Sequence, residues 1–392
     1  MRKIILIIAS VLGTISVQAQ NTCEAVLAQV EANSTRLKAL SRQMEAQKLA
    51  NRTGIFLTNP EVEFNYLWGN PSAIGNRTDF SIKQAFDFPT AYGYRNKIAN
   101  LENNNAWLMY KAERINLLLS AKEVCIRLTY FNALKNQYEA RLLNARQIAE
   151  SYRKKSENGS ANAIELNKTE LNLTTVTNEM VQIEVERQAL LSELRRLNGG
   201  VDIRFEEAAF APSALASDFE VWYMEAEGKS PVLQYVKAEI EVNEKRVKLS
   251  RAMGLPKLSA GYMMEKVVGQ DFQGLTVGVS IPLWENKNRV KQAKADVKAS
   301  QAVAEDTRMQ FYNQLQSLFV KATALQTSVG SYRSLLLNHN NEVLLKKALD
   351  SGEISLLDYL QETQYYYSAI DNLLSAERDL ELSIAQLSAV EL

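Results

Sequence analysis

The stretch from Lys346 to Gln364, KKALDSGEISLLDYLQETQ, decides the fold of this chain. It is free of proline and rich in helix-forming residues, and a single glycine, Gly352, interrupts it. Glycine adopts the left-handed backbone conformation without a steric penalty, so the stretch predicts a tight reversal between two helices. A second stretch, ENGSANAIELNKTELNL, predicts an equivalent turn at Gly159. The chain is therefore expected to contain two helical hairpins.

The two turns belong to a tandem duplication. In an ungapped register Pro60 lies over Pro256 and Tyr66 over Tyr262, and the two glycine turns keep nearly the same offset. We therefore predict two repeats of one plan, over residues 20–200 and 217–392, with a join over 201–216.

Each repeat is expected to contain short helices, a β-hairpin and a long helical hairpin. The β-hairpins are predicted at about 59–88 and about 257–283, and the helical tips near 159 and 352. Proline is absent between Thr90 and Ala211, so a helix from Thr90 to Asn158 would be about 100 Å long at 1.5 Å per residue. Such a helix must lie against other helices along its length, as in a coiled coil.

The first residues have the features of a secretory signal. Arg2 and Lys3 supply the positive end, an apolar stretch follows, and small residues suit cleavage after Ala19. We predict that residues 1–19 are a signal peptide. No later stretch offers about 20 uninterrupted apolar residues, so no transmembrane helix is expected in the mature chain.

Composition argues against nucleic-acid binding and against an enzyme. The 45 basic and 45 acidic residues balance, so no polyanionic partner is indicated. His339 is the single histidine, and no phosphate-binding loop or metal-ligand spacing accompanies it. We therefore predict no catalytic residues, no cofactor and no metal site.

The predicted strands alternate between apolar and polar residues. A soluble sheet with one buried face shows the same alternation. The strand length of about ten residues and aromatic residues near the strand ends favour strands of an outer-membrane barrel. Four strands cannot close a barrel around a channel whereas twelve can, so a trimer is the smallest fitting assembly. The residues predicted to face the membrane are Val62, Phe64, Tyr66, Trp68, Phe80, Ile82, Phe86, Phe88, Tyr262, Val277, Val279 and Ile281.

With these features the chain resembles the TolC-type outer-membrane channels. The resemblance rests on the duplicated plan, the strand-to-helix junctions QAFDFP and VSIPLW, and the two glycine turns. It implies a mixed α/β membrane protein: a homotrimer with a twelve-stranded β-barrel, four strands per chain, in the lipid of a Gram-negative-type outer membrane. A long α-helical barrel would continue it into the periplasm. A periplasmic adaptor would dock at the tips, and an inner-membrane efflux transporter would supply the energy.

The resemblance also assigns roles to the two tips. The predicted docking residues are Asn158, Gly159, Ser160 and Ala161 on the first tip and Ser351, Gly352, Glu353 and Ile354 on the second. Asp358 matches a gate aspartate of the family. Three copies around an axis would favour cations in the constriction. Ser355 and Asp358 also have the spacing of a helix cap, so both roles stay open. Gln361 and Glu165 are further gate candidates, although Glu165 repeats the cap spacing after Asn162 and is expected to be structural.

The second tip departs from the pattern of the family. Ile354 stands where some members carry an arginine that locks the closed tip, and Gln361 stands where a second acid can occur. The closed state is therefore expected to be held differently. Tyr152, Arg153 and Tyr359 are the candidate substitutes.

Cys23 and Cys125 are the only cysteines. The exported compartment permits a disulfide, and the repeat plan places both residues at comparable distances from the strands on neighbouring helices. We predict that they pair; the alternative is two buried thiols.

Two other functions share this architecture. The chain could be the exit duct of an ATP-driven protein exporter instead of an efflux system. A periplasmic coiled-coil adaptor also contains long helical hairpins, but the duplication and the alternating strands argue against it.

Overall fold

The computed structural model describes residues 22–338 and 342–392. The predicted signal peptide and His339 lie outside this part of the chain. The chain forms two compact units. Unit 1 includes the chain up to Ala39, residues 113–226 and residues 312–392, and unit 2 includes residues 40–112 and 227–311. Within the described residues, every helix is too short or too polar to cross a membrane.

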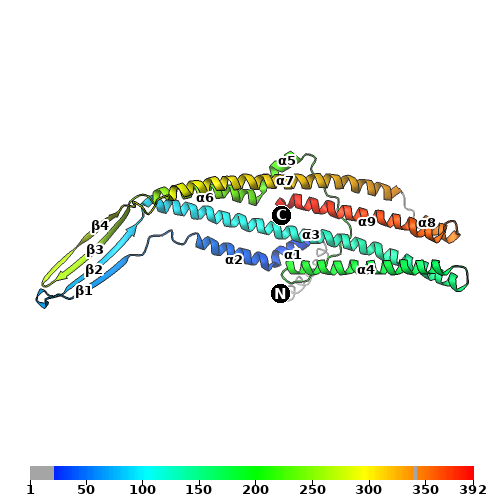
Figure 1. Ribbon diagram of the computed structural model, residues 1–392, viewed down its shortest axis with the longest axis horizontal. Helices are drawn as coiled ribbons and strands as arrows, with labels where there is room; N and C mark the ends of the chain where they lie inside the picture. Colours follow the sequence, from blue (N-terminus) through cyan, green and yellow to red (C-terminus); the bar gives the residue numbers. More distant parts are fainter. Residues whose placement is uncertain (1–21, 339–341) are drawn as a thin grey trace, which may run out of the picture. The chain divides into compact units, whose positions relative to one another are not determined.

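Unit 2 contains one antiparallel sheet of four strands in the order β1-β2-β3-β4 (Figure 1). The strands are β1 (Glu61–Leu67), β2 (Arg77–Phe86), β3 (Lys257–Val267) and β4 (Gln270–Ser280), and a short 3-10 helix, η1 (Ser72–Ile74), lies between β1 and β2. A turn at Gly269, whose φ is +78°, joins β3 to β4. One hairpin thus comes from each predicted repeat.

The register places the predicted apolar set on one face of this sheet. Val62 pairs with Ile82, Ile82 with Tyr262 and Tyr262 with Leu275. Directly paired residues of antiparallel strands point to the same side, so these side chains share a face. The opposite face carries polar pairs such as Glu61 with Lys83.

Three residues of the predicted membrane-facing set fall just outside the strands. Trp68 follows the last residue of β1, Phe88 directly precedes a helix that begins at Pro89, and Ile281 follows the last residue of β4. Pro282 explains the end of β4, because proline has no N–H to donate to a sheet. β4 also begins at Gln270, five residues before the apolar alternation starts at Leu275.

Helices of unit 2 are joined by polar contacts. The unit holds most of α2 (Thr35–Ala50) and α6 (Pro231–Ala252), with the first parts of α3 (Pro89–Glu157) and α7 (Arg289–Asn338). Arg246 of α6 pairs with Glu102 of α3 at 2.6 Å, and Asn105 Nδ2 donates to Glu239 of α6 at 2.8 Å. These contacts hold α3 against α6.

The remaining helices belong mainly to unit 1. They are α1 (Cys23–Asn33), α4 (Ala163–Leu197), α5 (Phe219–Lys229), α8 (Glu342–Ser351), α9 (Leu356–Leu387) and the 3-10 helix η2 (Ser388–Glu391). α3 has 69 residues, which confirms the long helix predicted from Thr90 to Asn158. The corresponding helix of the second repeat is described as two helices, α7 and α8. Within the predicted join, Phe205 is buried and only 1% exposed, whereas the other residues are exposed or half-buried.

Candidate functional site: the helical tips

The first tip is a glycine turn followed by a reciprocal helix cap. Gly159 has φ of +70°, and the N–H of Ser160 donates to the carbonyl of Lys155 at 2.7 Å. α4 then begins with a capping box: the N–H of Glu165 donates to Asn162 Oδ1, and the N–H of Asn162 donates to Glu165 Oε2, both at 2.9 Å. Glu165 therefore has the structural role that its spacing predicts.

The second tip repeats this arrangement around Gly352. Its φ is +76°, and the N–H of Glu353 donates to the carbonyl of Ala348 at 2.9 Å. The N–H of Asp358 donates to Ser355 Oγ at 3.2 Å, and the Ser355 hydroxyl donates to Asp358 Oδ2 at 2.6 Å. The Asp358 carboxylate thus caps α9 while its side chain remains on an exposed part of the helix. Gln361 is also exposed.

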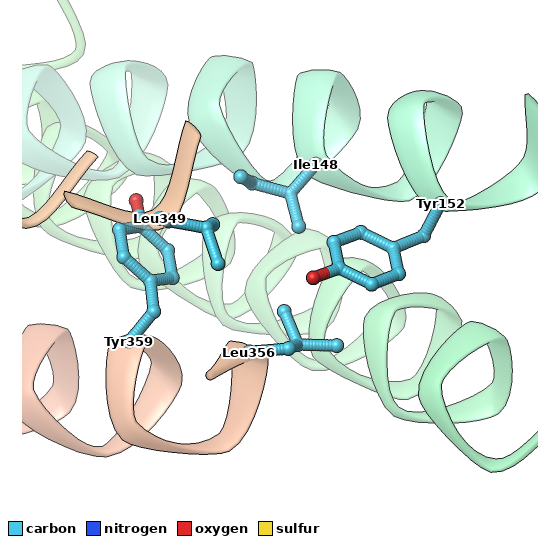
Figure 2. Close-up of a cluster of buried hydrophobic side chains, with 5 residues drawn as sticks. All are labelled: Ile148, Tyr152, Leu349, Leu356 and Tyr359. Atoms are coloured by element: carbon cyan, nitrogen blue, oxygen red, sulfur yellow. The ribbon is translucent and has the colours of Figure 1, made fainter. Parts of the chain in front are cut away.

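Beneath the turns, apolar side chains from three helices meet. This tip cluster consists of Ile148 and Tyr152 of α3, Leu349 of α8, and Leu356 and Tyr359 of α9 (Figure 2). Tyr359 is only 1% exposed. The second hairpin therefore rests on α3 through a buried apolar contact. Two of the predicted lock substitutes, Tyr152 and Tyr359, belong to it.

The other predicted tip residues divide into two groups. Ala161 and Ile354 pack against the tip cluster. The rest of the predicted docking set is exposed: Asn158, Gly159, Ser160, Ser351, Gly352 and Glu353. Arg153 is not part of the contact between the hairpins, because it pairs with Glu170 of α4 at 3.2 Å.

A polar layer lies next to the tip cluster and also joins α3 to α9. We use this name for Arg141 and Asn144 of α3 with Tyr367 and Asp371 of α9. Arg141 is 4% exposed and donates to both carboxylate oxygens of Asp371, at 2.6 and 2.9 Å. Asn144 Nδ2 donates to the Tyr359 hydroxyl at 2.8 Å. The layer holds the second hairpin in a defined register on α3.

Burial controls the electrostatics of the polar layer. Burial alone would lower the pKa of Arg141, but the hydrogen bond and charge of Asp371 raise it above its ordinary value. Burial also raises the pKa of the Tyr367 phenol, whose hydroxyl donates to Glu342 at 3.0 Å. At neutral pH the Arg141 guanidinium is therefore charged and the Tyr367 phenol is neutral.

The polar layer leaves room for solvent. A cavity of about 40 Å³ is lined by Arg141, Asn144 and Thr363, among others. In each of these three side chains one buried polar atom makes no hydrogen bond within the described residues. A cavity of this size with polar walls can hold one water molecule.

Sequence reasoning missed the polar layer. Arg141 and Asp371 are 230 residues apart, and neither stands in a motif that points to the other. The described residues contain no cluster of histidine, cysteine and carboxylate side chains that could hold a metal ion. The site is thus a structural junction with an exposed rim.

Comparison with known proteins gives a family and a fold. Residues 222–390 match the model of a family described as Outer membrane efflux protein. A search of curated proteins finds no match. The structure is similar to the CmeC outer membrane channel of Campylobacter jejuni, with a TM-score of 0.75 and 15% identity over 94% of this chain and 85% of that chain.

Two further solved structures share the fold. The outer membrane protein VceC of Vibrio cholerae has a TM-score of 0.71 and 14% identity over 94% of each chain. The open state of the MtrE outer membrane channel of Neisseria gonorrhoeae has a TM-score of 0.67 and 13% identity over 94% of this chain and 88% of that chain.

The fold is that of the TolC-type outer-membrane channels. The family model over residues 222–390 and the shared fold agree with the predicted resemblance. The solved structures that share the fold are named as outer membrane channels or an outer membrane protein. The four-stranded sheet and the mainly helical remainder agree with the predicted fold class; the trimer and the closed barrel stay predictions.

Proposed function

We propose that the chain is the outer-membrane exit duct of a tripartite efflux system. It would passively conduct substrates from a periplasmic adaptor and an inner-membrane transporter to the exterior. The observation that carries the proposal is the pair of exposed glycine turns, each at the end of a helical hairpin. Such turns offer a rigid rim for docking, because capping boxes already satisfy the helix ends behind them.

The sheet supports a trimer in which each chain contributes four strands. Its apolar face is continuous across the register, and β1 and β4 each have one unpaired edge in the single chain. Unpaired edges accept strands of another chain. Three sheets joined edge to edge would close a barrel of twelve strands, with the apolar face toward lipid.

The second hairpin is the proposed moving part. It touches α3 through the tip cluster and the polar layer. Together these contacts would take the locking role of the arginine that stands at the position of Ile354 in some family members. Opening would separate α8 and α9 from α3 and break the contacts of Tyr359 and Arg141. Asp358 would stand at the constriction as well as capping α9.

A photo-crosslinking experiment tests the docking proposal. A photoreactive residue would replace Ser160 or Ser351, which lie on exposed turns, and captured proteins would be identified by mass spectrometry. The matched control replaces Ser192, an exposed serine of α4 that lies about 45 Å along the helix from the first tip.

The identity of the captured protein decides between the two duct functions. Capture of the adaptor of a proton-driven pump at both tips, and not at Ser192, supports efflux. Capture of the adaptor of an ATP-driven exporter assigns the duct to protein secretion. Absence of capture at both tips from a correctly inserted protein would show that the docking assignment is wrong.

A further inference from the structure

The N-terminal helix α1 lies antiparallel against α3 within unit 1. Cys23 of α1 is near Cys125 of α3, and Glu31 of α1 pairs with Arg114 of α3 at 2.6 Å. Because the order of the two contacts is reversed along α3, the helices run in opposite directions. Val26 and Val30 of α1 are fully buried in this contact region. The position of the two cysteines is therefore set by packing along the whole helix pair.

The two thiols are neighbours across the contact between α1 and α3. Cys23 is the first residue of α1 and is partly exposed, whereas Cys125 is only 1% exposed. Both are free thiols in the structure.

We propose that Cys23 and Cys125 form an intramolecular disulfide in the exported protein. The bond would fasten the start of the mature chain to the middle of α3. It would close a loop that contains α2, the β1-β2 hairpin and the first part of α3. This proposal concerns covalent structure and does not depend on which system the duct serves.

The reaction requires a disulfide-bearing thiol oxidant, such as a periplasmic dithiol–disulfide protein. The Cys23 thiolate attacks one sulfur of the oxidant, whose other sulfur leaves as a thiolate. The Cys125 sulfur then attacks Cys23 in this mixed disulfide and releases the second thiolate. The two protons of the original thiols end on the reduced oxidant, which gains the two electrons.

The local environment agrees with this order of events. The hydrogen bond with Cys125 lowers the pKa of the Cys23 thiol in spite of its burial. The hydrogen bond with Cys23 and burial raise the pKa of Cys125. A thiolate is the reactive form, so the partly exposed and more acidic Cys23 is the residue that an oxidant meets first.

Mass tagging of the exported protein tests the proposal. Outer membranes are quenched with acid, the protein is denatured, and a maleimide-linked polyethylene glycol is added with or without prior reduction. The wild type should take no tag before reduction and two tags after it. Cys23→Ser and Cys125→Ser should each take one tag in both conditions. One or two tags on the unreduced wild type, or a disulfide-linked dimer on a non-reducing gel, would overturn the proposal.

A topological measurement gives an independent readout. A site for a specific protease is inserted between Gly54 and Ile55, in the turn segment after α2. After cleavage, the fragment that carries Cys23 should stay with the rest of the chain on a denaturing gel and separate only on reduction. In the Cys125→Ser background it should separate without reductant. Separation of the wild-type fragment without reductant would contradict the disulfide.

Discussion

At the residue scale, a reciprocal cap begins the helix after each tip, although the capping residues differ between the two tips. Asn162 with Glu165 and Ser355 with Asp358 both form reciprocal caps, so each carboxylate satisfies backbone donors at its own helix start. Within a single chain, helix capping is enough to explain the positions of the Glu165 and Asp358 carboxylates. A gate role for Asp358 is an additional claim, and it can be separated from capping by removing charge while keeping an acceptor oxygen.

Asp358→Asn is expected to lower the preference of the channel for cations and to leave its thermal unfolding temperature nearly unchanged. The amide oxygen can still accept the Ser355 hydroxyl, but three charges disappear from the proposed constriction. Glu165→Gln is the matched control, because it makes the same change in the cap of the other tip. Ion selectivity in planar bilayers checks the prediction. Equal selectivity in Asp358→Asn and the wild type would show that Asp358 is only a cap.

Glu381 provides a pH-dependent contribution to stability. Burial raises its pKa above the ordinary value of 4.5, although Ser213 donates a hydrogen bond to it at 2.7 Å. Between 4.5 and the raised value the folded chain binds more protons than the unfolded chain, so stability falls as pH rises through this window.

Glu381→Gln should therefore raise the unfolding temperature at pH 7 and weaken its decline above pH 4.5. Glutamine carries no charge to desolvate and keeps an oxygen for Ser213. Glu186→Gln, at an exposed position of α4, is the control and should change stability by less than about 0.5 kcal/mol. Calorimetry of the purified protein across pH is the measurement. A lower unfolding temperature for Glu381→Gln at pH 7 would contradict the argument.

At the scale of elements, the second hairpin is held on α3 by two kinds of contact. The tip cluster contributes apolar burial without directional preference, whereas the polar layer specifies one register. Removing Asp371 alone should lower stability more than removing both partners of the ion pair, because the unpaired Arg141 guanidinium would remain buried.

Asp371→Leu is expected to destabilise the contact between α3 and α9 by about 3 kcal/mol, since it leaves Arg141 without its countercharge. The double variant Arg141→Met/Asp371→Leu removes both charges and should recover most of that loss. Amide hydrogen exchange over residues 359–375 measures the effect directly. Equal protection loss in the single and double variants would show that the ion pair does not hold the hairpin.

At the scale of the whole molecule, the apolar face of the four-stranded sheet is exposed to solvent in the single chain. Val277 is 82% exposed in the single chain, and Leu275 is 87% exposed. A continuous exposed apolar face of this kind requires lipid or protein against it. Similar structures include outer membrane channels, and we propose that lipid covers this face.

Val277→Lys should reduce outer-membrane insertion strongly, because a lysine at the middle of the lipid-facing band costs about 2–4 kcal/mol per chain. Thr276→Lys is the matched control: it introduces the same charge one residue away, on the polar face of β4. The amount of heat-modifiable oligomer in outer-membrane fractions is the measurement. Equal loss for both variants would contradict the assignment of the lipid-facing side.

The sequence by itself determined the local features of this protein. Glycine turns, helix caps, proline-free helices and alternating strands depend on residues close together along the chain. Their physical causes can therefore be read before any fold is known. The long helix, both capping boxes and the shared apolar face were predicted in this way.

Only the tertiary structure decided which residues hold the second hairpin on α3. Arg141 meets Asp371, and Tyr152 joins Tyr359 in one cluster, across separations of more than 200 residues. In the tertiary structure Ala161 and Ile354 also pack against the tip cluster, and Arg153 pairs with Glu170 of α4. Contacts of this kind follow from how helices pack side by side, and local spacing carries no information about which positions will face each other.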